Sequence, residues 1–110
     1  MKLLLIVLNS SETLEEVLEG LIEAGVPGAT VVDSTGMGHI LENVPLFAGM
    51  RNVFRAAKPH NNMIFSAIPD ERAAETLEIL ATILDCADGH GKGIAFTVPI
   101  DAAIGLHAGS

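Results

Sequence analysis

The sequence has little of several residue types, and each shortage excludes a class of protein. It contains one cysteine, Cys86, so no disulfide can form within the chain, and a lone cysteine in an apolar helical pattern is typical of a reducing compartment. Six basic residues stand against fourteen acidic ones, and the net charge of −8 disfavours binding to nucleic acid or to an anionic membrane. No apolar run approaches the length of a membrane span. We therefore expect a cytoplasmic protein.

Apolar side chains are what the sequence has in abundance. Hydrophobic residues make up 49% of only 110 residues, and a single domain of this size has too much surface to hide them all inside. The opening stretch, residues 2–8, is apolar at odd and even positions alike, so a strand there must be covered on both faces. We therefore expect a homo-oligomer in which other subunits supply part of the cover.

A helix and a second strand are predicted to follow. Thr13 and Glu16 have the spacing of a capping box, and the apolar positions after them recur with the period of a helix. Gly25 is expected to end this helix in the left-handed conformation. The turn after it leads into a predicted strand at residues 29–34.

The remaining sequence supplies two more strands and one more helix. Strands are predicted at residues 63–68 and 94–98, and the helix between them opens near Pro69. The order βαββαβ is typical of an α+β, ferredoxin-like sandwich, in which a four-stranded antiparallel sheet carries both helices on one face. The chain is then a single domain over residues 1–110. Two helices cannot cover both faces of this sheet, so we expect the helix-free face to meet other subunits.

Strands two and three are joined by a connection at about residues 36–60, which is far longer than a hairpin needs. Part of it is expected to form a short helix beginning near Pro45. Its apolar stripe would form local core or a surface that docks a partner, and we favour local core because exposed apolar patches are uncommon. The stripe consists of Phe47, Met50, Val53 and Phe54.

Glycines and basic residues mark the candidate ligand-binding loops. Gly89, Gly91 and Lys92 lie in a glycine-rich loop before strand four, which either cradles a phosphate or simply turns the chain. Arg51 and Arg55 are spaced to point the same way on a helical turn, and Lys58 follows them in the long connection. These cations would either grip an anionic ligand or an acidic partner, or lie on a solvated face.

Histidines and acidic residues are weaker candidates. The histidines show no close metal-ligand spacing, so a metal site would have to be assembled across loops or subunits; they are His39, His60, His90 and His107. The candidate acid-base groups are Asp33 with Ser34 and Thr35, or Asp85 with Asp88, but no nucleophile, base and orienting group fall together at a sensible spacing. We therefore do not expect an enzyme.

Four features in order along the chain carry a family resemblance. They are Gly36-Met37-Gly38 after strand two, the long connection, the glycine-rich loop, and the segment from Phe96 to Ile104. Together they make the chain resemble the PII family of nitrogen-regulatory signalling proteins. The resemblance implies a trimer of ferredoxin-like subunits whose sheets face inward, with ligand sites between subunits at the base of the long loop and the glycine-rich loop. It also implies adenine nucleotides or 2-oxoglutarate as ligands, and partner proteins regulated by movement of the loop.

The chain departs from the PII pattern where that family binds phosphate. When the last strands are aligned, the family's phosphate-binding lysine corresponds to Ile94, and Lys92 lies two residues earlier. The two arginines that the family carries after its Ala-Ile pair are replaced by Gly105 and His107. Because the chain has no tyrosine, the family's uridylylation site on the loop is absent as well.

These observations lead to one hypothesis and one alternative. We expect a non-catalytic, PII-like regulatory protein that binds a small anionic metabolite or nucleotide between subunits of a homotrimer and regulates a partner through its long loop. The alternative is a metal-binding or purely structural trimer without nucleotide. The predicted ligand-binding residues are Gly36, Met37, Gly38, His39, Arg51, Arg55, Lys58, Gly89, Gly91 and Lys92.

Overall fold

The computed structural model describes the chain except for residues 10, 27, 42–43, 47–60, 85–90 and 107–110. The strands are β1 (Lys2–Leu8), β2 (Thr30–Ser34), β3 (Asn61–Ile68) and β4 (Gly93–Pro99). The helices are α1 (Leu14–Glu23), α2 (Met37–Leu41) and α4 (Ala73–Leu84), and 3-10 turns η1 (Ser11–Thr13) and η3 (Asp70–Arg72) lead into α1 and α4. Residues 100–106 follow β4 without regular structure.

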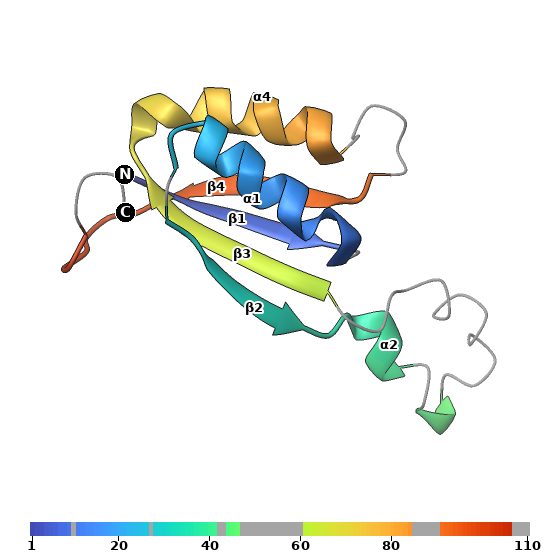
Figure 1. The fold of residues 1–110 in the computed structure, drawn as a ribbon. Helices are drawn as coiled ribbons and strands as arrows, with labels where there is room; N and C mark the ends of the chain where they lie inside the picture. The colour runs from blue at the N-terminus through green and yellow to red at the C-terminus, as the bar shows by residue number, and fades with distance from the viewer. Residues whose placement is uncertain (10, 27, 42–43, 47–60, 85–90, 107–110) are drawn as a thin grey trace.

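The four strands form one sheet in the order β2-β3-β1-β4 (Figure 1). β1 pairs antiparallel with β3 on one side and with β4 on the other, and β2 completes the sheet by pairing antiparallel with β3. The elements of this sheet and the two long helices follow the predicted order along the chain. The structure therefore confirms the α+β, ferredoxin-like architecture.

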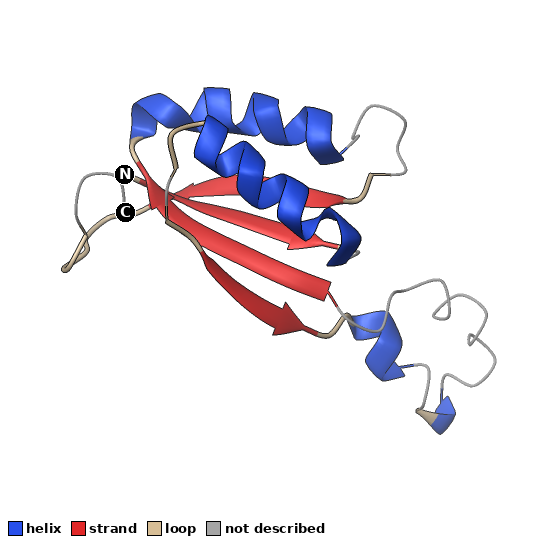
Figure 2. Ribbon diagram, in the orientation of Figure 1, coloured by secondary structure: helices blue, strands red, loops and turns tan. Residues whose placement is uncertain are grey.

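Both long helices lie on one face of the sheet, as Figure 2 shows. Alternate strand residues point beneath them, and Leu4, Ile6 and Leu8 of β1 have no exposed surface. The other members of this buried cluster are Val17, Leu21, Ala24, Val26, Ile64, Ile68, Leu80 and Leu84. Neither α1 nor α4, nor any other helix that the structure describes, is long and apolar enough to cross a membrane.

The opposite face of the sheet, here called the open face, carries no helix. On β1, this face carries Leu3, Leu5 and Val7, which alternate with the buried residues. The strand register places Leu5 opposite Phe65 on β3 and Phe96 on β4. The same alternation places apolar side chains along all three strands: Leu3, Leu5, Val7, Met63, Phe65, Ala67, Ile94, Phe96 and Val98. Ile94 is 58% exposed and Phe96 is 42% exposed. On β1 the prediction of apolar side chains on both faces is therefore confirmed, whereas the helix-covered face of β3 also carries Asn62 and Ser66.

The predicted capping box at the start of α1 is wrong. Thr13 belongs to η1 and has helical dihedral angles (φ −88°, ψ −10°), so its side chain makes no cap hydrogen bond. The chain already turns helically from Ser11, and the Thr13 side chain is buried instead of accepting from a backbone amide in the first turn of α1. The predicted end of the helix is confirmed, since Gly25 has φ +82°.

Arg72 ties the end of α1 to the start of α4. Its Nη1 donates a hydrogen bond to the carbonyl oxygen of Ala24 over 3.1 Å. A cation at this position also interacts favourably with the negative end of the α1 dipole, and α1 itself has no basic residue in its last turn. The contact therefore links the two helices on the same face of the sheet.

Candidate functional site

The root of the long connection is fixed where β2 ends and β3 begins. The Ser34 hydroxyl donates to the carbonyl oxygen of Asn61 over 3.2 Å, and Asn62 Nδ2 donates to Asp33 Oδ1 over 3.0 Å. Asn62 is only 8% exposed, so its hydrogen bond is shielded from competing water. Both ends of the connection are therefore held in register, whatever conformation the connection takes beyond them.

The predicted Gly-Met-Gly turn lies directly after this root and is partly helical. Gly36 is half-buried, and its carbonyl oxygen accepts from the amide of Ile40 over 3.3 Å at the start of α2. Met37 is 72% exposed although it is apolar. The short helix Met37–Leu41 was not predicted, because two glycines in three residues favour a turn over a helix.

The glycine-rich loop meets the other side of the sheet through hydrogen bonds of Gly91 and Lys92. The amide of Lys92 donates to the carbonyl oxygen of Leu84 at the end of α4 over 2.9 Å, and its carbonyl oxygen accepts from the amide of Asn9 over 2.9 Å. Asn9 Nδ2 also donates to the carbonyl oxygen of Gly91 over 3.3 Å. The amide of Lys92 is therefore occupied, and its exposed side chain is what this end of the loop offers to a ligand.

Gly93 is required by the close approach of β4 to β1. A Cβ atom at this position would lie 2.3 Å from the carbonyl oxygen of Val7 and 3.1 Å from the Cα of Leu8. Both are backbone atoms, so a side chain could be accommodated only by moving a strand. At least one glycine of the loop is therefore explained by packing, without any ligand.

The two candidate loops lie at the same end of the sheet but on opposite edges. β1 and β2 end there, and β3 and β4 begin there, so Gly36 and Lys92 share the right-hand end in Figure 1. Gly36 follows one edge strand and Lys92 precedes the other, with β3 and β1 between them. Three strand spacings amount to about 14 Å, which is too far for one phosphate or carboxylate group to contact both loops of a single subunit.

Several predicted residues lie outside the described part of the chain. Among the predicted ligand-binding residues these are Arg51, Arg55, Lys58 and Gly89. The apolar stripe of Phe47, Met50, Val53 and Phe54 lies outside it too, as do Cys86, His60, His90 and His107. For His39, only the backbone within α2 is described.

Two of the candidate acid-base groups, Asp33 and Ser34, have structural partners, whereas Asp85 and Asp88 lie outside the described residues. The carboxylate of Asp33 accepts from Asn62, and the hydroxyl of Ser34 donates to Asn61, so both hold the root of the connection. Within the described residues, no group of three or more histidine, cysteine, aspartate or glutamate side chains is placed to hold a metal ion. The side chains of the four histidines lie outside the described part of the structure, so the metal-binding alternative stays a prediction.

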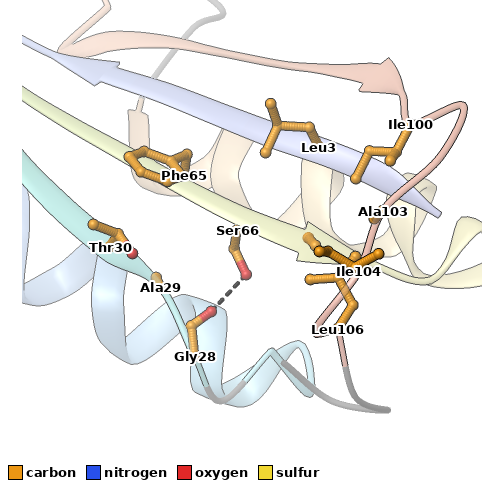
Figure 3. Close-up of a pocket in the computed structure, with 11 residues that line it drawn as sticks. Leu3, Gly28, Ala29, Thr30, Phe65, Ser66, Ile100, Ala103, Ile104 and Leu106 are labelled. Carbon is orange, nitrogen blue, oxygen red and sulfur yellow. Dashed lines mark hydrogen bonds between the residues drawn. The ribbon is translucent and has the colours of Figure 1, made fainter.

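A pocket of about 400 Å³ lies at the opposite end of the sheet (Figure 3). Its walls are the start of β1, the end of β3, the segment before β2, and the tail after β4, and most of its lining is apolar. The hydroxyl of Ser66 donates to the carbonyl oxygen of Gly28 beside it. The pocket contains none of the predicted ligand-binding residues, and Leu3 and Phe65 belong both to it and to the open face. The pocket is therefore a hollow in the open face, at the end of the sheet opposite the two candidate loops.

Three asparagines at the predicted site were missed by reasoning from the sequence. Asn9, Asn61 and Asn62 stand at the ends of strands, where asparagine is commonly explained as a turn residue. The signal that could have found them is their position, because each lies next to a strand end that borders one of the two candidate loops. Their hydrogen bonds, not their turn propensity, set the geometry of the loop roots.

Comparison with known proteins agrees with this architecture. The family model of the nitrogen regulatory protein P-II matches residues 1–110, which is the whole of the chain. No curated protein matches the sequence significantly. The family match covers the sheet, both long helices and both candidate loops. The chain therefore belongs to the nitrogen regulatory protein P-II family.

Proposed function

We propose that this protein is a non-catalytic regulator that binds a small anionic metabolite or nucleotide between the subunits of a homotrimer. Ligand binding would shift the 36–60 connection between conformations that differ in affinity for a partner protein. The observation that carries the proposal is the placement of Gly36 and Lys92 at one end of the sheet on opposite edges. A single anionic group that contacts both loops must take them from different subunits.

The open face supports the same arrangement. If copies pack through their open faces around a rotation axis, the β4 edge of one subunit can approach the β2 edge of the next. Such packing would bring Lys92 of one copy toward Gly36 and Met37 of its neighbour. It would also cover Ile94 and Phe96, which are substantially exposed in the single chain.

Among the residues that the structure describes, few cations lie near the proposed cleft. Where other members of the family carry an arginine, Gly105 has φ +82°, a conformation that costs a non-glycine residue roughly 1 kcal/mol or more. The backbone of the tail is therefore unsuited to an arginine at this position. Lys92 is the described cation at the loop end of the sheet, because Lys2 begins β1 at the other end and Arg72 bonds to Ala24.

A thermal-shift screen of the whole chain with ATP, ADP, cyclic AMP and 2-oxoglutarate tests the ligand. An anion present at 100 times its dissociation constant should stabilise the protein by about 2.7 kcal/mol. The shift should disappear in Lys92→Ala and persist in Lys2→Ala, which removes a lysine from the opposite end of the sheet. If no anion stabilises the wild type, or if Lys92→Ala responds like the wild type, the proposed site is wrong.

A further inference from the structure

Asn9 makes two hydrogen bonds to neighbouring residues of the glycine-rich loop. Its backbone amide donates to the carbonyl oxygen of Lys92, which continues the β1–β4 ladder by one pair. Its side chain Nδ2 donates to the carbonyl oxygen of Gly91. Any residue except proline could make the first bond, but the second needs a short side chain that ends in a donor. The side chain of Asn9 therefore does something that strand pairing does not require.

The two bonds to the Gly91–Lys92 peptide hold it from opposite sides. Its carbonyl oxygen is bound by Asn9 Nδ2, and its amide N–H is bound by the carbonyl oxygen of Leu84. In a trans peptide these two groups point in opposite directions, so the plane is pinned between the end of β1 and the end of α4. The direction in which the Lys92 side chain leaves the backbone is fixed as a result.

Fixing the backbone matters more for lysine than for most residues that bind anions. The lysine side chain is long and has a single charged group at its tip, so a ligand must immobilise it on binding. A rigid backbone reduces the number of positions that this group samples before the ligand arrives. Lys92 is exposed, and its neighbour Gly93 is held against β1, so the flexible part begins at its Cβ.

We propose that Asn9 is a positioning residue, which orients the Gly91–Lys92 peptide and thereby aims Lys92 at the anion. Its effect on binding rests on the function proposed above, whereas its effect on the peptide does not. Asn9 does not itself touch the ligand in this account. A residue that only closes the β1–β4 ladder would act through its amide, so changing its side chain would alter neither the peptide nor the affinity.

The test compares Asn9→Ala, Asn9→Asp and Asn9→Gln with the wild type in the full-length protein. The first measurement is amide hydrogen exchange at Lys92, which needs no ligand. Asn9→Ala and Asn9→Asp, which lose the donor, should raise exchange about two- to fivefold, as expected for the loss of one exposed hydrogen bond. Asn9→Gln keeps an amide donor and should restore part of the protection. Unchanged exchange in Asn9→Ala would overturn the proposal.

The second measurement is the affinity for ADP, inorganic phosphate and 2-oxoglutarate. Asn9→Ala should weaken binding by about two- to fivefold without changing the melting temperature of the ligand-free protein. Thr82→Ala is the matched control, because it removes an exposed side-chain hydrogen bond to Glu78 within α4, away from the sheet. If exchange rises in Asn9→Ala but affinity does not fall, Asn9 has no role in the site although the ligand site stands. If the wild type binds none of these anions, the proposed function fails and the exchange result alone decides the role of Asn9.

Discussion

Along β1, the two faces of the sheet have nearly the same composition and very different surroundings. Leu4, Ile6 and Leu8 alternate along β1 with Leu3, Leu5 and Val7, so the strand is equally apolar on both sides. The first set is completely buried under α1 and α4, whereas the second remains partly exposed. What separates the two faces is therefore the cover that the chain provides, since the side chains themselves are alike.

This difference shows which apolar side chains are buried within one subunit and which can be buried only by assembly. Burial of an aliphatic side chain contributes roughly 1.5–3 kcal/mol, and the helix face has realised this contribution inside one subunit. The open face can realise it only when another molecule covers it, so its contribution depends on protein concentration. Mutations on the two faces should therefore differ in kind as well as in size.

The largest effect is expected from a matched pair of substitutions at adjacent residues of β1. Ile6→Asp places a carboxylate in the completely buried cluster with no partner, which should prevent folding. Leu5→Asp places the same group on the open face between Phe65 and Phe96, where a single subunit leaves it access to water. It should yield a folded subunit that no longer assembles. Circular dichroism and analytical ultracentrifugation measure both outcomes.

The same pair can contradict the proposed interface. If Leu5→Asp sediments as the wild type does, the open face is not where subunits meet. If the wild type itself is a stable monomer of 11.5 kDa at micromolar concentration, there is no assembly to disrupt and the proposed intersubunit clefts do not exist.

A second pair of substitutions, on β3, should have a smaller effect. It should distinguish burial within one subunit from burial by assembly, because only the second depends on protein concentration. Ile64→Ala leaves a cavity under the helices and should cost about 2–5 kcal/mol of unfolding free energy at any protein concentration. Phe65→Ala removes a ring from the open face, so its cost should grow with the concentration at which the wild type is assembled. Urea unfolding at two concentrations, tenfold apart, measures the difference. Identical concentration dependence in the two variants would show that the faces do not differ in this way.

The architecture could be predicted from the sequence because its signals are strong and local. Strand residues 2–8 and 63–68 are apolar runs without competing patterns, and the left-handed residue at Gly25 has a well-defined conformational cause. Boundaries moved by one or two residues, as at Asn61 and Gly93, because strand ends depend on the partner strand as well as on their own residue types.

The candidate site could be predicted only in outline. The positions of the two loops follow from the topology, so the sequence was sufficient to place Gly36 and Lys92 at one end of the sheet. Hydrogen bonds that hold those loops join distant residues, such as Asn9 and Gly91, which are 82 positions apart, and no local pattern contains them. The predicted capping box is wrong because Thr13 already has helical dihedral angles and its side chain is buried.

The smallest effect is expected from a pair of substitutions at the start of β3, where both faces of the sheet carry an asparagine. Asn62→Ala removes the hydrogen bond to Asp33 from a residue that is 8% exposed, and should cost about 1 kcal/mol. Asn61→Ala changes a half-buried residue whose backbone carbonyl, not its side chain, accepts from Ser34, so that bond survives and the cost should be about 0.5 kcal/mol or less. Chemical denaturation of both variants under identical conditions measures the two costs. Equal losses would mean that the helix-side position of Asn62 gives its hydrogen bond no advantage, and that the root of the long connection is held by the strand ladder alone.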